Sequence, residues 1–173
     1  KMYNSHDPHI KITTIKGKTF NPKSININHP DIKEKVYVLE EDVLLTYRSQ
    51  IDGGYEENSQ QIAKIKGYSN YNEILSVGRD LALMLGIDTN HNAPLLSIFV
   101  PNRKIKTFLH KDPSRNFYKP NQINNFSIFN IHPEINQKYL FADLKYTQSI
   151  TKRESEVSAI ELSIHDEHKM KDV

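Results

Sequence analysis

The sequence predicts one α+β domain, and three observations lead to this fold class. The chain has 173 residues, 37% of them hydrophobic, and a chain of this length buries roughly two-thirds of its unfolded surface. Short segments with alternating or continuous apolar residues recur and favour strands. Two longer segments carry apolar residues at helical spacing, and no linker or repeat divides the chain. We therefore expect residues 1–173 to form a single domain, with 1–9 and 165–173 loosely ordered.

The first third of the chain predicts strands and loops. Residues 10–17 (IKITTIKG) alternate apolar and polar side chains, which favours a strand, and 21–33 contain two prolines and indicate a loop. Residues 35–51 contain two apolar bursts separated by three acids, which predicts two short strands joined by a turn. The paired glycines within 52–58 indicate a further turn or loop.

Later segments predict helices followed by strands. Residues 70–87 carry apolar side chains at near-helical spacing and predict an amphipathic helix, and 94–100 (PLLSIFV) predict a buried strand. Residues 102–112 predict a second helix, and 113–125 predict a loop. The remaining strands are expected at 126–131, 138–146 and 155–164.

Composition excludes several classes of function. With 23 basic and 21 acidic residues the chain lacks the basic excess of a dedicated nucleic-acid binder. The absence of cysteine removes disulfides, thiol nucleophiles and cysteine metal sites. The longest strongly apolar stretch, 81–87, is far too short to span a membrane. No signal peptide is visible, and a start at Lys1 suggests a processed fragment.

Glu154 and Glu156 flank one serine at the start of the last predicted strand. On an extended strand this spacing puts both carboxylates on one face, roughly 6–7 Å apart along the chain. Like charges this close repel unless water or a cation lies between them. The pair is therefore either a solvated, charge-protected strand edge or a catalytic pair.

A catalytic role for Glu156 would need two further groups. A carboxylate can stabilise the positive charge that develops when a glycosidic bond breaks. If the leaving group belongs to a dinucleotide, a cation must hold its phosphates, and the fork of arginine matches phosphate oxygens. Arg48 stands at the end of an apolar burst beside the paired glycines, and Ser97 is the one hydroxyl in the strand predicted at 94–100.

These motifs resemble those of the bacterial mono-ADP-ribosyltransferase toxins of the arginine–serine–glutamate class. That family has an aromatic–arginine pair on its first core strand, a Ser-Thr-Ser or variant on the next, and Glu-x-Glu or Gln-x-Glu on a late strand. LLTYRSQ, PLLSIFV and RESEV stand here in the same order, and the resemblance covers most of residues 36–164. The sequence departs at Ser97, which is followed by Ile-Phe, and at Ser158 and Glu161, which interrupt the apolar run after the glutamates.

The resemblance implies two packed, mostly antiparallel sheets that form a cleft for NAD+, with helices on the N-terminal side. It implies S_N1-like transfer of ADP-ribose from NAD+ to a side chain of a target protein, an arginine among the candidates, without a metal. Arg48 would bind the phosphates of NAD+, and Ser97 would line the cofactor and position Glu156. Glu156 would stabilise the oxocarbenium ion, while Glu154 would orient or deprotonate the acceptor. The tyrosines expected to stack on nicotinamide or close over it are Tyr47, Tyr55, Tyr68 and Tyr71.

The resemblance also implies a biological setting. The domain would be the monomeric toxic part of a larger secreted bacterial protein, delivered into the cytoplasm of a target cell. Its partners would be a target protein in a host or competitor cell and a cognate immunity protein.

Two other readings remain open. His165 and His168 would share a helical face with acids between them, so a metal hydrolase is conceivable. A serine hydrolase is not supported, because no Gly-x-Ser-x-Gly is present. The non-enzymatic alternative is a protein-interaction module, such as an effector adaptor, an immunity protein or an adhesin fragment. In that case the tyrosines and asparagine-rich loops form a binding surface.

Overall fold

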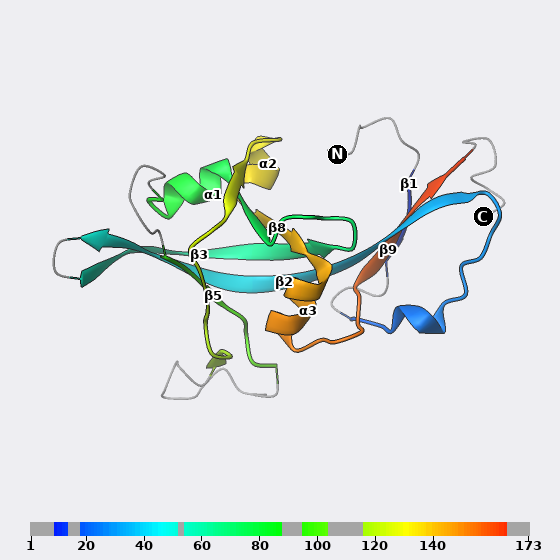
Figure 1. Ribbon diagram of the computed structural model, residues 1–173, viewed down its shortest axis with the longest axis horizontal. Helices are drawn as coiled ribbons and strands as arrows, with labels where there is room; N and C mark the ends of the chain where they lie inside the picture. Colours follow the sequence, from blue (N-terminus) through cyan, green and yellow to red (C-terminus); the bar gives the residue numbers. More distant parts are fainter. Residues whose placement is uncertain (1–8, 14–17, 52–53, 88–94, 104–115, 166–173) are drawn as a thin grey trace.

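The computed structural model describes residues 9–13, 18–51, 54–87, 95–103 and 116–165 (Figure 1). Within these residues the chain forms nine strands, three α-helices and one 3-10 helix. Strands dominate, and the expected α+β class is confirmed. The described helices are all too short to cross a membrane.

The elements differ widely in length, from three-residue strands to β2 with 20 residues. In chain order they are β1 (His9–Thr13), η1 (Pro22–Ser24), β2 (Ile32–Ile51), β3 (Gly54–Tyr68), β4 (Leu75–Gly78), α1 (Arg79–Met84), β5 (Leu95–Phe99), β6 (Asn121–Ile123), β7 (Ser127–Phe129), α2 (Pro133–Asn136), β8 (Tyr139–Asp143), α3 (Leu144–Thr151) and β9 (Ala159–Ile164).

β2 and β3 form a long antiparallel hairpin that runs across the molecule (Figure 1). The predicted turn at residues 40–42 was wrong, because β2 continues through all three acids. The side chains of Glu40, Glu41 and Asp42 pair with cationic side chains on both faces of β2. Nζ of Lys64 lies 3.3 Å from a Glu40 oxygen and 3.0 Å from an Asp42 oxygen, and Glu41 pairs with two arginines on the other face.

β3 begins at Gly54, so the loop expected over 52–58 is shorter than predicted. The sequence analysis assigned no strand to 59–68. In the structure Ala63, Ile65 and Gly67 face inward and are buried, and the residues between them face outward. The outward-facing residues 64 and 66 are lysines, so this strand is less apolar than the other strands.

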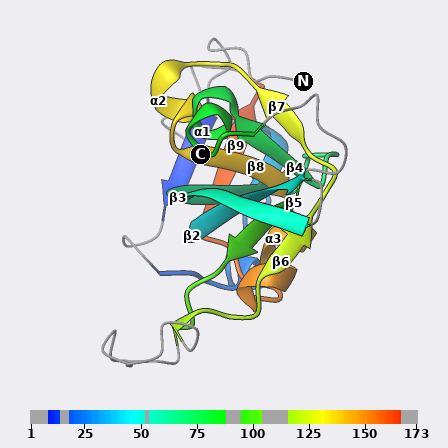
Figure 2. The ribbon, with the colours of Figure 1, turned by 90° about the vertical axis from the view of Figure 1, so that its left-hand side faces the viewer.

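One curled mixed sheet contains all nine strands (Figure 2). Its order is β1-β9-β2-β3-β8-β4-β7, and β5, which carries β6, also pairs with β2. β2 is antiparallel to β3, β5 and β9, whereas the pairs β3–β8 and β4–β7 are parallel. Hydrogen bonds thus connect the strands into one sheet, where two packed sheets were expected.

The length of β2 explains how one sheet accommodates this topology. One edge of β2 pairs with β3. Its other edge pairs with β9 over residues 32–38 and with β5 over residues 44–48. Between these two partners, residues 39–43 face a gap in the strand pairing. The side chains that close this gap belong to the site described below.

The helix expected over 70–87 begins only at Arg79. Residues Leu75–Gly78 instead form β4, a fully buried strand between β8 and β7. A short apolar run fits both helical and strand periods, and here pairing on both edges selects the strand. The helix expected over 102–112 falls mainly on residues that the structure does not describe.

The strand expected over 138–146 ends at Asp143. The Asp143 side chain caps α3 by accepting a hydrogen bond from the Tyr146 amide at 3.1 Å, as expected of an N-cap aspartate. α3 is the longest described helix, so helices do not gather on the N-terminal side as expected. The last strand begins at Ala159, four residues later than predicted.

The other expected strands are confirmed. β1 falls at the strand predicted over 10–17, β5 at 94–100 and β7 at 126–131. The loop expected over 113–125 contains the short strand β6.

The main core lies between the inward face of the sheet and its helices. It gathers buried residues from β2, β3, β4, β5, β8, α1 and α3, among them Val43, Leu45, Ile65, Val77, Leu81, Leu85, Ile98, Leu140 and Ile150. A second cluster around Leu39, Ile160 and Leu162 lies beneath the β2–β9 pair.

Two glycines allow other elements to lie directly on the sheet. A Cβ atom at Gly67 would lie 2.4 Å from Oγ1 of Thr147 in α3, and one at Gly78 would lie 2.2 Å from the carbonyl oxygen of Asn136 in α2. Because a Cβ atom at either position would overlap its neighbour, both helices depend on the absence of a side chain there.

We expect Gly78→Ala to destabilise the protein by about 2 kcal/mol, the usual cost of forcing atoms into a packed contact. Gly78 has φ −63°, which alanine adopts without strain, so the change tests only the contact with Asn136. Urea unfolding measures the effect. Gln137→Ala, at an exposed neighbour of Asn136, should change stability by less than about 0.5 kcal/mol. Equal stability of Gly78→Ala and the native chain would contradict this contact.

Candidate functional site

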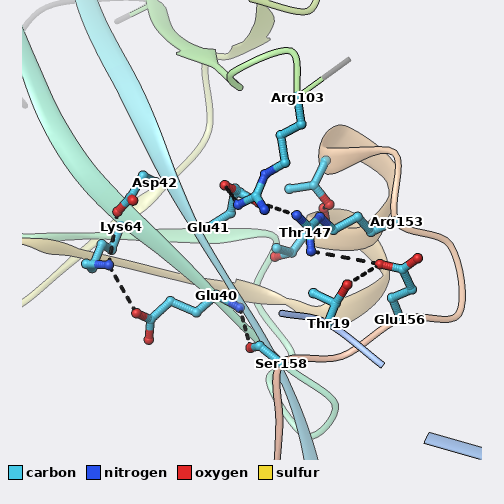
Figure 3. A network of polar contacts seen from close by, with 11 residues as sticks. Thr19, Glu40, Glu41, Asp42, Lys64, Arg103, Thr147, Arg153, Glu156 and Ser158 are labelled. Carbon is cyan, nitrogen blue, oxygen red and sulfur yellow. Dashed lines mark hydrogen bonds and ion pairs between the residues drawn. The ribbon is translucent and has the colours of Figure 1, made fainter. Parts of the chain in front are cut away.

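A buried carboxylate, Glu41, lies at the centre of the gap between β9 and β5 (Figure 3). Its side chain is only 3% exposed and contacts two arginines. Arg103, which follows β5, donates a hydrogen bond to Oε1. Arg153, which precedes β9, lies 3.3 Å from Oε2 and is itself 12% exposed. A buried charge needs such partners, because an unpaired one would cost several kcal/mol.

Glu156 belongs to the same network (Figure 3). Its carboxylate lies 3.8 Å from Arg153 and accepts a hydrogen bond from the Thr19 hydroxyl. Its backbone carbonyl accepts a hydrogen bond from the Gln148 side chain at 2.8 Å. These contacts connect the segment between α3 and β9 to α3 itself and to the residues that precede η1. They give Glu156 a structural role.

The two glutamates do not lie on a strand, and this prediction was wrong. Glu154 and Ser155 form a turn, and Ser155 has φ +66°. That left-handed conformation breaks the alternation on which the expected shared face depended. Glu154 is exposed and Glu156 is half-buried.

Arg48 and Ser97 lie on paired strands. Ser97 is the register partner of Thr46, two residues before Arg48, so both side chains belong to the outward face of β2 and β5. Ser97 is buried and Arg48 is exposed. Tyr47 belongs to the opposite face, where it is fully buried and its hydroxyl has no hydrogen-bond partner among the described residues.

The structure therefore brings Arg48 and Ser97 together on one face and separates them from Glu154 and Glu156. The Ser158 amide donates to the carbonyl oxygen of Val38 at 2.7 Å, which places the glutamate turn near residue 38 of β2. Arg48 stands ten residues further along, about 33 Å on an extended strand. Glu154 and Glu156 do not converge on Arg48 and Ser97.

The outward face carries a group of five aromatic rings that sequence analysis recognised only in part. The ring of Phe141 has its centroid 4.6 to 6.4 Å from four other rings. We call these five residues the aromatic face: Tyr68, Tyr71, Phe129, Tyr139 and Phe141. All five are half-buried.

Residues of the aromatic face come from β3, β7, β8 and the turn before β4. Tyr68 and Tyr71 were expected at a nicotinamide site, and Tyr55 lies in β3 with a side chain outside the described part. The other three were missed. Tyr139 and Phe141 alternate with the buried Leu140 and Ala142, and this period of two was the available signal.

A hydroxyl–carboxylate cluster fixes one side of the aromatic face. The Tyr71 hydroxyl donates to Oγ of Ser76 at 2.6 Å, and the hydroxyls of Ser76 and Ser127 donate to Glu73. The Ser127 hydroxyl, followed by that of Ser76, lowers the pKa of the exposed Glu73 carboxyl. Burial raises the pKa of Tyr71. Tyr71 is thus a neutral, positioned ring.

A ladder of alternating charges continues the outward face along β2, β3 and β9. Lys66 lies 4.0 Å from Glu40 and 3.9 Å from Glu161, and its ammonium group lies 5.4 Å from the centre of the Tyr68 ring. The hydrogen bond to Asp42 raises the pKa of Lys64. Each charge of this ladder has a partner of opposite sign within the protein.

No group of three or more potential metal ligands converges among the described residues. His165 is exposed, and His168 lies outside the described part of the chain. No protein-family profile matches the sequence, and neither does any curated protein.

We expect Glu41→Gln to destabilise the fold by about 3 kcal/mol, because it leaves the arginines without their buried counter-charge. Most of the loss comes from Arg153, since Arg103 is 50% exposed and can turn to water. Urea unfolding checks this. Asp42→Asn is the matched control, because Asp42 is 64% exposed and its ion pair contributes less than about 1 kcal/mol. Equal losses in the two variants would contradict a special role for Glu41.

Proposed function

We propose that this chain is a protein-interaction module that binds its partner through the aromatic face. The observation that carries this proposal is the gathering of five half-buried rings around Phe141 on an outward sheet face. Aromatic residues are enriched in protein interfaces and supply much of the binding energy.

The surroundings of the aromatic face fit this role. Tyr71 is held by Ser76 before any partner arrives, which reduces the entropy lost on binding. The charge ladder around Lys64 and Lys66 would form a polar rim beside an apolar centre, the usual anatomy of an interface. Of the classes of module left open by the sequence, an effector adaptor, an immunity protein and an adhesin fragment all fit.

The glutamate network also favours a binding module. Glu156 is engaged with Thr19 and Arg153, and Glu154 lies in an exposed turn. Neither contacts the strand positions of Arg48 or Ser97.

Photo-cross-linking tests this proposal. A photoreactive amino acid at Tyr139, on the border of the aromatic face, should cross-link one discrete protein in bacterial or eukaryotic lysate. The same amino acid at Lys145, exposed on α3, should not. An excess of native chain should compete for that partner, whereas an excess of Tyr139→Ser should compete at least tenfold more weakly, since an interface aromatic contributes about 2 kcal/mol. Equal cross-linking at both positions, or equal competition, would contradict the proposal.

A second candidate is the mono-ADP-ribosyltransferase activity that the motifs suggest, with NAD+ as substrate. The placement of Arg48 and Ser97 on one face of paired strands favours it. The catalytic acid would then be a residue other than Glu154 or Glu156. Glu57 is a candidate, because it is the register partner of Arg48 on β3. In this mechanism Arg48 would hold the NAD+ phosphates, and the acid would stabilise the oxocarbenium ion as nicotinamide leaves.

Label transfer from biotinylated NAD+ tests the transferase. The native chain should label a protein in lysate, and Arg48→Lys should lower the rate at least tenfold, because lysine cannot replace the arginine fork. Comparison of Glu57→Gln with Glu156→Gln identifies the acid, since only the variant of the catalytic glutamate loses the label. Absence of label in every lysate, without any NAD+-induced thermal shift, rules the transferase out.

A further inference from the structure

A cleft of about 570 Å³ opens between the approach to β6 and the C-terminal end of α3. Its walls are residues 118–122 from one segment and Ile150 and Lys152 from the other. The volume is in the range of sites that hold small molecules. Neither the aromatic face nor the glutamate network contributes a residue to it.

The polar groups of the cleft suit an anion. Lys119 and Lys152 bring two ammonium groups from different segments, and Asn121, which shares a face of β6 with the buried Ile123, adds a side-chain amide. None of the described residues that line the cleft is acidic. Lysine binds phosphate as a compact point charge, and amide groups can donate to the remaining phosphate oxygens.

The backbone of Lys152 is a second, independent observation. Lys152 ends α3 with φ +57° and ψ +40°, the left-handed conformation that glycine usually supplies at this position. A lysine at a helix C-terminus is favourable for the helix dipole, which accounts for a positive charge near this end. It does not account for a side chain at a position where glycine would avoid strain. Lys152 is one of the residues that line the cleft.

The cleft also has an apolar part. Ile150 is buried in the main core, and the Tyr118 ring packs against that core while it lines the cleft. A ligand with a ring or a sugar beside its phosphate would therefore contact both kinds of surface.

We propose that this cleft binds a small phosphate-bearing molecule of nucleotide size. Lys119 and Lys152 pair with the phosphate, Asn121 bonds one of its remaining oxygens, and Tyr118 and Ile150 contact the uncharged part. This site is independent of the partner surface proposed above.

Calorimetric titration of the full chain tests the site with inorganic pyrophosphate, ribose 5-phosphate and ADP, and with adenosine as the phosphate-free probe. At least one phosphate compound should bind with one-to-one stoichiometry, and more tightly than adenosine. Lys152→Gly should weaken this binding roughly tenfold, as expected for the loss of one charged hydrogen bond. The same variant should raise the melting temperature by roughly 2–4 °C, because glycine relieves the left-handed strain.

The opposite directions of these two effects separate binding from folding. Lys145→Ala removes a lysine elsewhere on α3 and should leave the binding constant unchanged. Three results would overturn the proposal: no saturable binding of any phosphate compound, adenosine binding as tightly as ADP, or an equal loss of binding in Lys145→Ala and Lys152→Gly.

Discussion

The pairing of Glu41 with Arg103 and Arg153 is the interaction on which the rest of the structure depends. One edge of β2 pairs first with β9 and then with β5, and Glu41 lies between these two pairings. Arg103 arrives from the exit of β5 and Arg153 from the entry to β9. A single buried carboxylate therefore bridges the segments that lead out of β5 and into β9. Its burial makes the connection specific, because a carboxylate buried there without arginine partners would cost several kcal/mol.

Several consequences follow from this arrangement. Arg153 must reach Glu41, which draws the turn after α3 against β2 and places Glu156 beside Thr19. The same turn contains Ser155 in a left-handed conformation and follows directly on Lys152. The end of α3 lines the cleft proposed above for a phosphate compound. This end is held in place by the ion pair between the adjacent residue, Arg153, and Glu41.

The sequence predicted elements whose signals are local. β5 is a bounded apolar run, and Tyr139–Asp143 alternates, so both were found as strands. The acids of β2 were misread because the cations that balance them lie 22 to 112 residues later in the chain, from Lys64 to Arg153. The Glu154–Glu156 pair was misread because the positive φ of Ser155 leaves no mark in the sequence. Motif order alone could place Arg48 beside Ser97, since their strands pair, but could not reveal that β9 joins the far end of β2.

The pairing of β2 with the last strand has a consequence for how the protein is made. β9 spans Ala159–Ile164 and is the neighbour of both β1 and β2. During synthesis on the ribosome, β1 and the edge of β2 that pairs with β9 must therefore wait until residues 159–164 have emerged. Arg153 emerges well after Glu41, so Glu41 stays in water, without this buried partner, until then. The hairpin of β2 and β3 can form early, but the complete sheet can form only once β9 has emerged, and chains that still lack β9 would be natural clients for chaperones.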